Sequence, residues 1–186
     1  MIALRRALTW LVISQVALLG VTGAFLVFGY RPTAAQAWGG LVSEDAGWSL
    51  ALAVRTAHRW LAWTSVLVAI VLAAVSFSES MIRWRGPLRR RSGAITGPTI
   101  VILIVIAVLT GFALPWDQLA LKAVTVGSNI RGYRWVFGND VQFVLVGGAE
   151  VDVATIRAVF VAHVIVVPAL LAVALGIAAR RDRGDG

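Results

Sequence analysis

The sequence contains no cysteine, and this absence removes several kinds of chemistry together. Iron-sulfur clusters, thioether-linked cofactors, disulfide bridges and thiol nucleophiles all need a cysteine sulfur. Methionine, the other sulfur side chain, occurs only as Met1 and Met81. We therefore expect that any metal or cofactor bound by this chain is held non-covalently, and by ligands other than sulfur.

Charge is scarce as well. Charged residues make up 14% of the 186 residues and hydrophobic ones 59%, with a mean hydropathy of +0.84, whereas an ordinary soluble domain is about 25% charged. Four apolar segments are long enough to cross a bilayer as helices: about Leu8 to Tyr30, Ala51 to Phe77, Thr99 to Trp116 and Ala154 to Ala179. The sequence predicts an all-α membrane protein, a single domain of four transmembrane helices over residues 1–186. We expect Ser92–Pro98 and Arg180–Gly186 to be solvated connectors.

The distribution of basic residues predicts the orientation. With the N-terminus inside, ten of the 17 basic residues lie on the cytoplasmic side, against three acids, Glu79, Asp182 and Asp185. Short cytoplasmic loops of membrane proteins carry this excess of Lys and Arg. We therefore expect both termini inside, in the cytoplasmic (inner) cell membrane, and we explain the net charge of +8 by contact with the lipid bilayer rather than with nucleic acid.

The chain has only two histidines, His58 and His163, and each lies inside an apolar segment. A polar side chain within a membrane span indicates function, and histidine is an axial ligand of haem iron. Counted from helix starts near Ser49 and near residues 152–153, both histidines lie about 13–16 Å along their helices, at the same depth. The residues alone leave two readings open: a haem held between the two imidazoles, or two hydrogen-bonded core histidines.

Glycines and arginines lie where a haem would need them. Gly23 in the first span and Gly111 in the third would let helices approach a flat macrocycle closely. Arg55 precedes His58 by one helical turn and Arg59 follows it, so both are candidates to pair with haem propionates. Snorkelling of these arginines to the membrane surface is the alternative explanation.

Five short motifs together resemble the N-terminal, haem-carrying four-helix half of the cytochrome b/b6 family, over nearly the whole chain. They are Thr22-Gly23, the segment Val54 to Trp60 around His58, the run Thr110 to Gln118 at the end of the third span, Gly147-Gly148, and Ala154-Thr155-Ile156 followed by Phe160, His163 and Pro168. The resemblance implies one non-covalent haem b with His58 and His163 as iron ligands. It also implies that Gly23 and Gly111 flank the haem.

The sequence departs from this family where a second, inner haem would bind. The family has a further histidine about two heptads along each of the second and fourth helices, and these positions hold Leu72 and either Ile177 or Ala178. Thr9 also replaces a family glycine in the first span. We therefore expect the outer haem alone.

One bis-histidine haem would be a relay of single electrons, because its iron has no open position for a substrate. By resemblance, Leu114, Pro115, Trp116 and Asp117, with the stretch Ala123 to Tyr133, are expected to border a quinone or a partner. Pro115 and Trp116 are equally explained as a helix terminator and an interfacial anchor. Asp117 is a candidate either to accept a quinol proton or to pair with Lys122.

We expect an electron-transfer subunit of a respiratory or photosynthetic oxidoreductase complex, not catalytic alone. Expected partners are a subunit-IV-like chain, a Rieske protein or a periplasmic electron-transfer subunit, docking on the outer loop from Gln118 to Asp152. The alternative from another class is a haem-free membrane anchor or assembly subunit.

Overall fold

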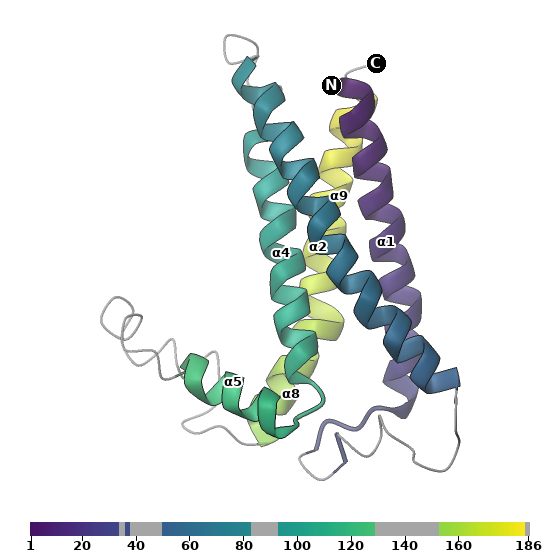
Figure 1. Cartoon of the computed structure of the whole chain (residues 1–186), viewed down its shortest axis with the longest axis vertical. Coiled ribbons are helices and arrows are strands. Elements are labelled where there is room, and N and C mark those ends of the chain that lie inside the picture. The colour runs from purple at the N-terminus through teal and green to yellow at the C-terminus, as the bar shows by residue number, and fades with distance from the viewer. Residues whose placement is uncertain (34–35, 38–49, 83–92, 129–152, 185–186) are drawn as a thin grey trace.

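Four long apolar helices lie side by side as a bundle, and a short helix lies beyond one end of it (Figure 1). The computed structural model describes residues 1–33, 36–37, 50–82, 93–128 and 153–184. The first three spans are α1 (Ile2–Gly29), α2 (Leu50–Ile82) and α4 (Gly93–Ala113). The fourth combines α8 (Val153–Val161), the π-helical turn η2 (Ala162–Val166) and α9 (Val167–Gly184), and the short helix is α5 (Gln118–Ser128).

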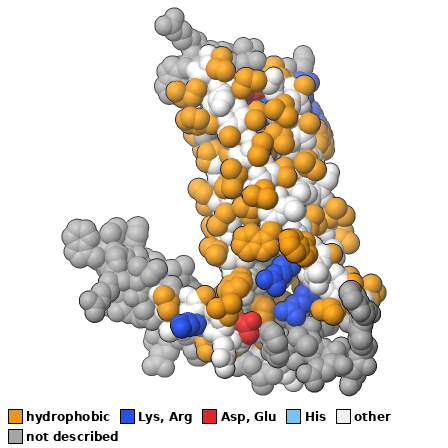
Figure 2. Space-filling model, in the orientation of Figure 1, with side chains coloured by type: hydrophobic (Ala, Val, Ile, Leu, Met, Phe, Trp, Pro, Cys, Tyr) orange, Lys and Arg blue, Asp and Glu red, His pale blue; other side chains and the backbone are white. Residues whose placement is uncertain are grey.

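The predicted fold class is confirmed. Every regular element in the described ranges is helical, and four helices are long and apolar enough to cross a membrane. Hydrophobic side chains cover the visible side of the bundle, whereas charged ones gather near its two ends (Figure 2). Large apolar residues such as Trp63 and Leu67 of α2 are more than half exposed, as expected for a surface that contacts lipid.

Hydroxyl side chains inside the spans are satisfied by their own helices. Six of them donate a hydrogen bond to the carbonyl four residues earlier, at 2.8–2.9 Å: Thr9, Ser14, Thr22, Ser80, Thr99 and Thr110. This back-bonding removes the cost of a bare hydroxyl in an apolar environment. The threonines and serines therefore do not interrupt the spans.

The helices extend beyond the predicted boundaries, and both predicted connectors were wrong in part. α1 begins at Ile2 and α2 continues to Ile82, while residues 93–98 belong to α4 and residues 180–184 to α9. The third span ends at Ala113 rather than Trp116. Hydropathy marks the part of a helix that contacts hydrocarbon, but the helix continues while its polar residues find partners.

Those partners form an ion cluster at the end of the bundle that holds both chain termini, which we call the terminal end (Figure 1). Arg5 of α1 donates through Nε to Glu79 of α2 at 2.8 Å and forms a second ion pair with Asp182 of α9. All three side chains are at most 4% exposed. Arg5 and Asp182 are thus buried and join three helices, instead of flanking the membrane in solvent.

The apolar core lies next to this ion cluster. It consists of Val12, Ala69, Leu72, Ile100, Ile104, Val167, Leu171, Ala174, Leu175 and Ala178. These residues come from α1, α2, α4 and α9, so the terminal half of the bundle is closed by direct packing of side chains.

The fourth span changes its winding at the histidine. Within η2 the Val167 N–H donates to the Ala162 carbonyl five residues earlier. Pro168 follows immediately; it has no N–H, and its ring excludes the carbonyl four residues before it from normal bonding. A π-helical turn is a common way to accommodate this, and such turns often lie at functional sites. His163 lies in this turn.

We predict that Arg5→Met destabilises the bundle by about 3–5 kcal/mol, because it leaves two buried carboxylates without their cation. The free energy of unfolding, measured by detergent titration of the purified protein, checks this. Arg183→Met is the matched control, since Arg183 is exposed in the same terminal region. Equal stability of the two variants would contradict a stabilising role of the ion cluster.

Candidate haem-ligand site

The structure brings His58 and His163 together in the half of the bundle nearer α5. Their ring centroids are 6.4 Å apart and their planes make an angle of 71°. His58 lies on α2 and His163 on η2, so each imidazole comes from a different side of the bundle. Both are partly buried.

A threonine of α1 fixes the orientation of the His58 ring. Thr22 Oγ1 lies 2.7 Å from His58 Nδ1 and donates its own hydrogen to the Leu18 carbonyl at 2.9 Å. With its hydrogen on the Leu18 carbonyl, the Thr22 hydroxyl can accept from His58, and this geometry matches the tautomer that has its proton on Nδ1. In a neutral imidazole the other nitrogen, Nε2, then has a free lone pair, which is the form that binds a metal.

His163 is held in the same way from α4. Thr110 Oγ1 lies 3.1 Å from His163 Nδ1 and donates to the Ile106 carbonyl at 2.8 Å. The Ala107 carbonyl lies 3.0 Å from the same nitrogen, so it is a second acceptor for the Nδ1 proton. Each histidine therefore belongs to a half-site: the first half-site is Thr22, Gly23 and His58, and the second is Thr110, Gly111 and His163.

The two threonines were not among the predicted site residues. The available signal was their position directly before each of the predicted glycines, as Thr22-Gly23 and Thr110-Gly111. Only the structure shows that both hydroxyls face an imidazole, because the histidines come from other helices.

Both predicted glycines touch the imidazoles. A Cβ at Gly23 would lie 3.3 Å from Cε1 of His58, and a Cβ at Gly111 only 2.7 Å from Cε1 of His163. The second distance is shorter than real Cβ contacts allow. Glycine at these positions lets each ring lie directly against the neighbouring helix.

These residues fit a metal-centred macrocycle. The separation of 6.4 Å matches the spacing of about 6 Å expected for two imidazoles on opposite sides of one ion, with metal–nitrogen bonds of about 2.0–2.1 Å. Within the described residues no group of three or more His, Cys, Asp or Glu side chains is placed to hold a metal. A metal between these two rings would need further ligands from a cofactor, and a porphyrin supplies four.

The two predicted arginines lie at the α5 end of α2. Arg55 is partly buried and lies near enough to Arg59 and Asp117 for their charges to interact. Arg59 is exposed. Both cations are thus within about one helical turn of His58 along the helix.

The predicted contact residues Leu114, Pro115, Trp116 and Asp117 form the turn between α4 and α5. Trp116 has a φ of 52°, a left-handed conformation that is strained for a side chain of this size. Asp117 Oδ1 accepts a hydrogen bond from the Ala120 N–H at 2.7 Å, so Asp117 caps the N-terminus of α5. Neither of the two roles expected for Asp117 included this cap.

Tyr30, which was not predicted as a site residue, joins this turn to the first helix. Its hydroxyl donates to the Leu114 carbonyl at 2.7 Å, and its ring stacks on Phe160 at 5.4 Å. Burial raises the pKa of Tyr30 to about 12, so the hydroxyl stays protonated at neutral pH. Residues 129–152, which include most of the predicted docking loop, lie outside the described residues.

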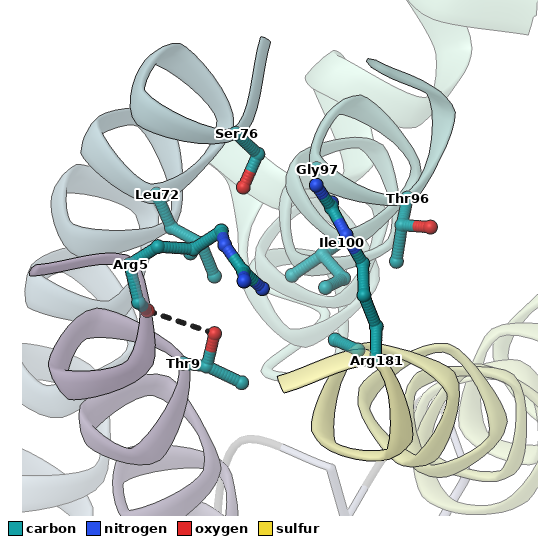
Figure 3. A pocket seen from close by; sticks show the side chains of 9 residues that line it. Arg5, Thr9, Leu72, Ser76, Thr96, Gly97, Ile100 and Arg181 are labelled. Atoms are coloured by element: carbon teal, nitrogen blue, oxygen red, sulfur yellow. Dashed lines mark hydrogen bonds between the residues drawn. The ribbon is translucent and has the colours of Figure 1, made fainter. Parts of the chain in front are cut away.

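The positions where the family has its second pair of histidines are filled by packed side chains. Leu72 is 2% exposed and Ala178 9%, whereas Ile177 is 52% exposed, so Ala178 is the residue that faces the bundle. At Gly97 a Cβ would lie 2.9 Å from the Ala73 backbone, so α4 and α2 are in direct contact there. A small pocket of about 10 Å³ lies in this region, lined by Arg5, Thr9, Leu72, Gly97 and Arg181 among others, and has room for about one water (Figure 3).

Comparison with known proteins identifies the family. The family model described as Cytochrome b/b6/petB matches residues 4–178. The chain belongs to the cytochrome b/b6 family. It is therefore a multi-pass membrane cytochrome of electron transfer.

Two relatives illustrate how far this similarity extends. Cytochrome b6 of Synechococcus sp. (strain CC9605) is 32% identical over 152 residues, which cover 82% of this cytochrome and 68% of the relative. Cytochrome b6 of Acaryochloris marina (strain MBIC 11017) is 30% identical over 156 residues, covering 82% and 69%. The resemblance inferred from the motifs is thus confirmed.

A solved structure shares the fold. A chain of a hyperthermophilic respiratory Complex III superposes with a TM-score of 0.77 at 22% identity. The alignment covers 97% of this cytochrome but only 48% of that chain, so this cytochrome corresponds to about half of it.

The glycine contacts predict a graded response to alanine. Gly111→Ala forces a Cβ to within 2.7 Å of the His163 ring and Gly23→Ala to within 3.3 Å of the His58 ring, whereas nothing lies within 4 Å of a Cβ at Gly20. Overpacking typically costs about 1–3 kcal/mol. We expect haem content per purified cytochrome to fall most in Gly111→Ala, less in Gly23→Ala and not in Gly20→Ala. A different order would argue against close contact between these helices and the imidazoles.

Proposed function

We propose that this cytochrome carries one b-type haem between His58 and His163 and relays electrons near the α5 end of the bundle. The observation that carries the proposal is the pair of imidazoles 6.4 Å apart, each with its Nδ1 hydrogen-bonded to a threonine hydroxyl. Two histidines packed only as core residues would have no reason to lie at the spacing of two ligands on one metal ion. This arrangement favours the haem over the alternative of two hydrogen-bonded core histidines.

A haem with two imidazole ligands passes single electrons and leaves no position for oxygen or substrate. The residues of the chain would hold it and set its surroundings. Thr22 and Thr110 keep both histidines in the tautomer that binds iron, and Gly23 and Gly111 leave room beside the rings. Arg55 and Arg59 would pair with the acidic propionates, because guanidinium groups bind carboxylates strongly.

The single-haem part of the proposal is supported by the packing at the terminal end. Leu72 and Ala178 occupy the places of the family's second histidine pair, and both belong to the apolar core. Neither side chain is a ligand for haem iron. Without a second haem, this chain alone offers no route for electrons across the whole membrane.

The orientation follows from the charges and from the shared position of the termini. Both termini lie at the end of the bundle opposite α5 (Figure 1), and the basic residues Arg5, Arg6, Arg180, Arg181 and Arg183 lie in the same terminal region. We propose that this end faces the cytoplasm and that the membrane is the inner cell membrane, since short cytoplasmic loops carry an excess of Lys and Arg. The histidine pair accordingly lies toward the outer side.

We further propose that the cytochrome works as one subunit of a membrane redox complex that exchanges electrons with quinone. A chain of this fold occurs in a respiratory Complex III, and its relatives are cytochromes b6. A subunit-IV-like chain, a Rieske protein or a periplasmic electron-transfer subunit would be the partner. The turn Leu114–Asp117 is the proposed contact for quinone or partner, because it lies at the end of α4 within one to two helical turns of Gly111.

The spectrum of the purified, reduced protein tests the proposal. We expect a low-spin b-type haem at one per chain, and its loss in His58→Leu and in His163→Leu, because each change removes one of the two iron ligands. Two haems per chain would contradict the single-haem assignment, and an unchanged spectrum in either variant would contradict the ligand assignment. A native protein without haem would instead favour the membrane-anchor alternative.

The two threonines predict an asymmetric effect. Thr22→Val removes the hydroxyl that lies against Nδ1 of His58, whereas Thr110→Val leaves the Ala107 carbonyl to accept from His163. Loss of such a hydrogen-bond partner typically lowers the affinity of the site for its metal about 10–100-fold, and it makes the imidazole less basic. We expect weaker haem binding and a higher midpoint potential in Thr22→Val, and a smaller change in Thr110→Val. Equal changes in the two variants would show that the Ala107 carbonyl does not share the proton.

A further inference from the structure

Tyr30 is placed to connect the two half-sites at their outer rim. It directly follows α1, which carries Thr22 and Gly23 of the first half-site. Its two contacts, however, belong to the second: the Leu114 carbonyl three residues after Gly111, and the Phe160 ring three residues before His163. Residues three apart on a helix lie on neighbouring parts of the same face. Phe160 lies about one helical turn before His163, and Leu114 lies in the turn three residues after Gly111, so Tyr30 contacts both segments that carry the second half-site.

The two contacts of Tyr30 are a short hydrogen bond and a ring stack. The Leu114 carbonyl lies just past the end of α4, where carbonyls lack a partner within the helix, so the Tyr30 hydroxyl satisfies it at 2.7 Å. The two rings are nearly parallel, at 14°, with centroids 5.4 Å apart. A tyrosine hydroxyl is a donor at neutral pH in any case, and burial raises the pKa of Tyr30 further, to about 12.

The second half-site needs such a support. His163 lies in a π-helical turn, whose winding departs from that of α8 and α9, and the turn after α4 contains the strained Trp116. At the terminal end the ion cluster of Arg5, Glu79 and Asp182 joins α1, α2 and α9. At the other end of the bundle, nearer α5, Tyr30 joins the end of α1 to the end of α4 and to α8.

We propose that Tyr30 is a positioning residue that fixes the spacing and the angle of the two imidazoles and so keeps both on the iron. This inference rests on the proposed haem. When one imidazole is held loosely, the reduced iron becomes accessible to an added ligand such as carbon monoxide, whereas firm ligation by both excludes it. Tyr30 thus acts through Phe160 and Leu114 without touching the metal.

The experiment uses the full-length cytochrome loaded with haem, in three variants. Tyr30→Phe removes only the hydrogen bond to Leu114, Tyr30→Leu removes the ring stack as well, and Phe28→Leu is the control because Phe28 is 92% exposed at the same end of α1. The measurements are carbon monoxide binding to the reduced protein and the low-temperature EPR g values of the oxidised protein, which respond to the angle between the imidazole planes.

We expect the carbon monoxide-reactive fraction to rise about two- to tenfold in Tyr30→Phe, the effect of one ordinary hydrogen bond on an equilibrium. It should rise further in Tyr30→Leu, with shifted g values in both, and stay at the wild-type level in Phe28→Leu. Wild-type behaviour of Tyr30→Phe and Tyr30→Leu, or an equal change in Phe28→Leu, would overturn the proposal. If Tyr30→Leu yields no haem protein, Tyr30→Phe decides, since it keeps the ring.

A wild-type protein without haem would instead refute the proposed function. The haem content of the wild type is measured before any variant is compared. It therefore distinguishes a failure of the haem proposal from a failure of the Tyr30 proposal.

Discussion

An imidazole has two nitrogens, and an apolar environment satisfies neither of them. This constraint organises the half of the bundle near α5. Nδ1 of each histidine is hydrogen-bonded to a threonine hydroxyl that also donates to a carbonyl of its own helix, so the ring cannot turn without losing a hydrogen bond. The second nitrogen is the one that would bind the proposed haem iron, and the placement of α1 beside α2 and of α4 beside η2 holds each ring for that role.

Different contacts hold the four helices together in the two halves of the bundle. Near the terminal end, apolar side chains fill the interior and a buried arginine joins carboxylates from two other helices. Near α5, helices approach through glycines that touch imidazoles. The packed core and the ion cluster hold the helices together at the terminal end, whereas the contacts near α5 set their spacing at the other end.

The turn after α4 contains one strained residue, and hydrogen bonds hold the residues on either side of it. Trp116 adopts a left-handed backbone conformation, which costs free energy, yet its neighbours are fixed on both sides. Asp117 caps α5, and the Leu114 carbonyl accepts from Tyr30. A conformation of this kind persists only where surrounding contacts overdetermine it. The turn is therefore held as part of the site rather than as an independent loop.

The amino-acid sequence by itself determined the fold class, the four spans, the histidine pair and both glycines, because hydrocarbon tolerates only helices and makes every polar residue within them conspicuous. It also identified the family through short motifs at fixed spacing. Only the tertiary structure decided that Thr22 and Thr110 hold the imidazoles, that Ala178 rather than Ile177 faces the interior, and that Arg5 and Asp182 are buried. Each of these depends on the rotation of one helix against another, and a single helix sequence does not contain that rotation, since it is set by side chains that meet from different spans.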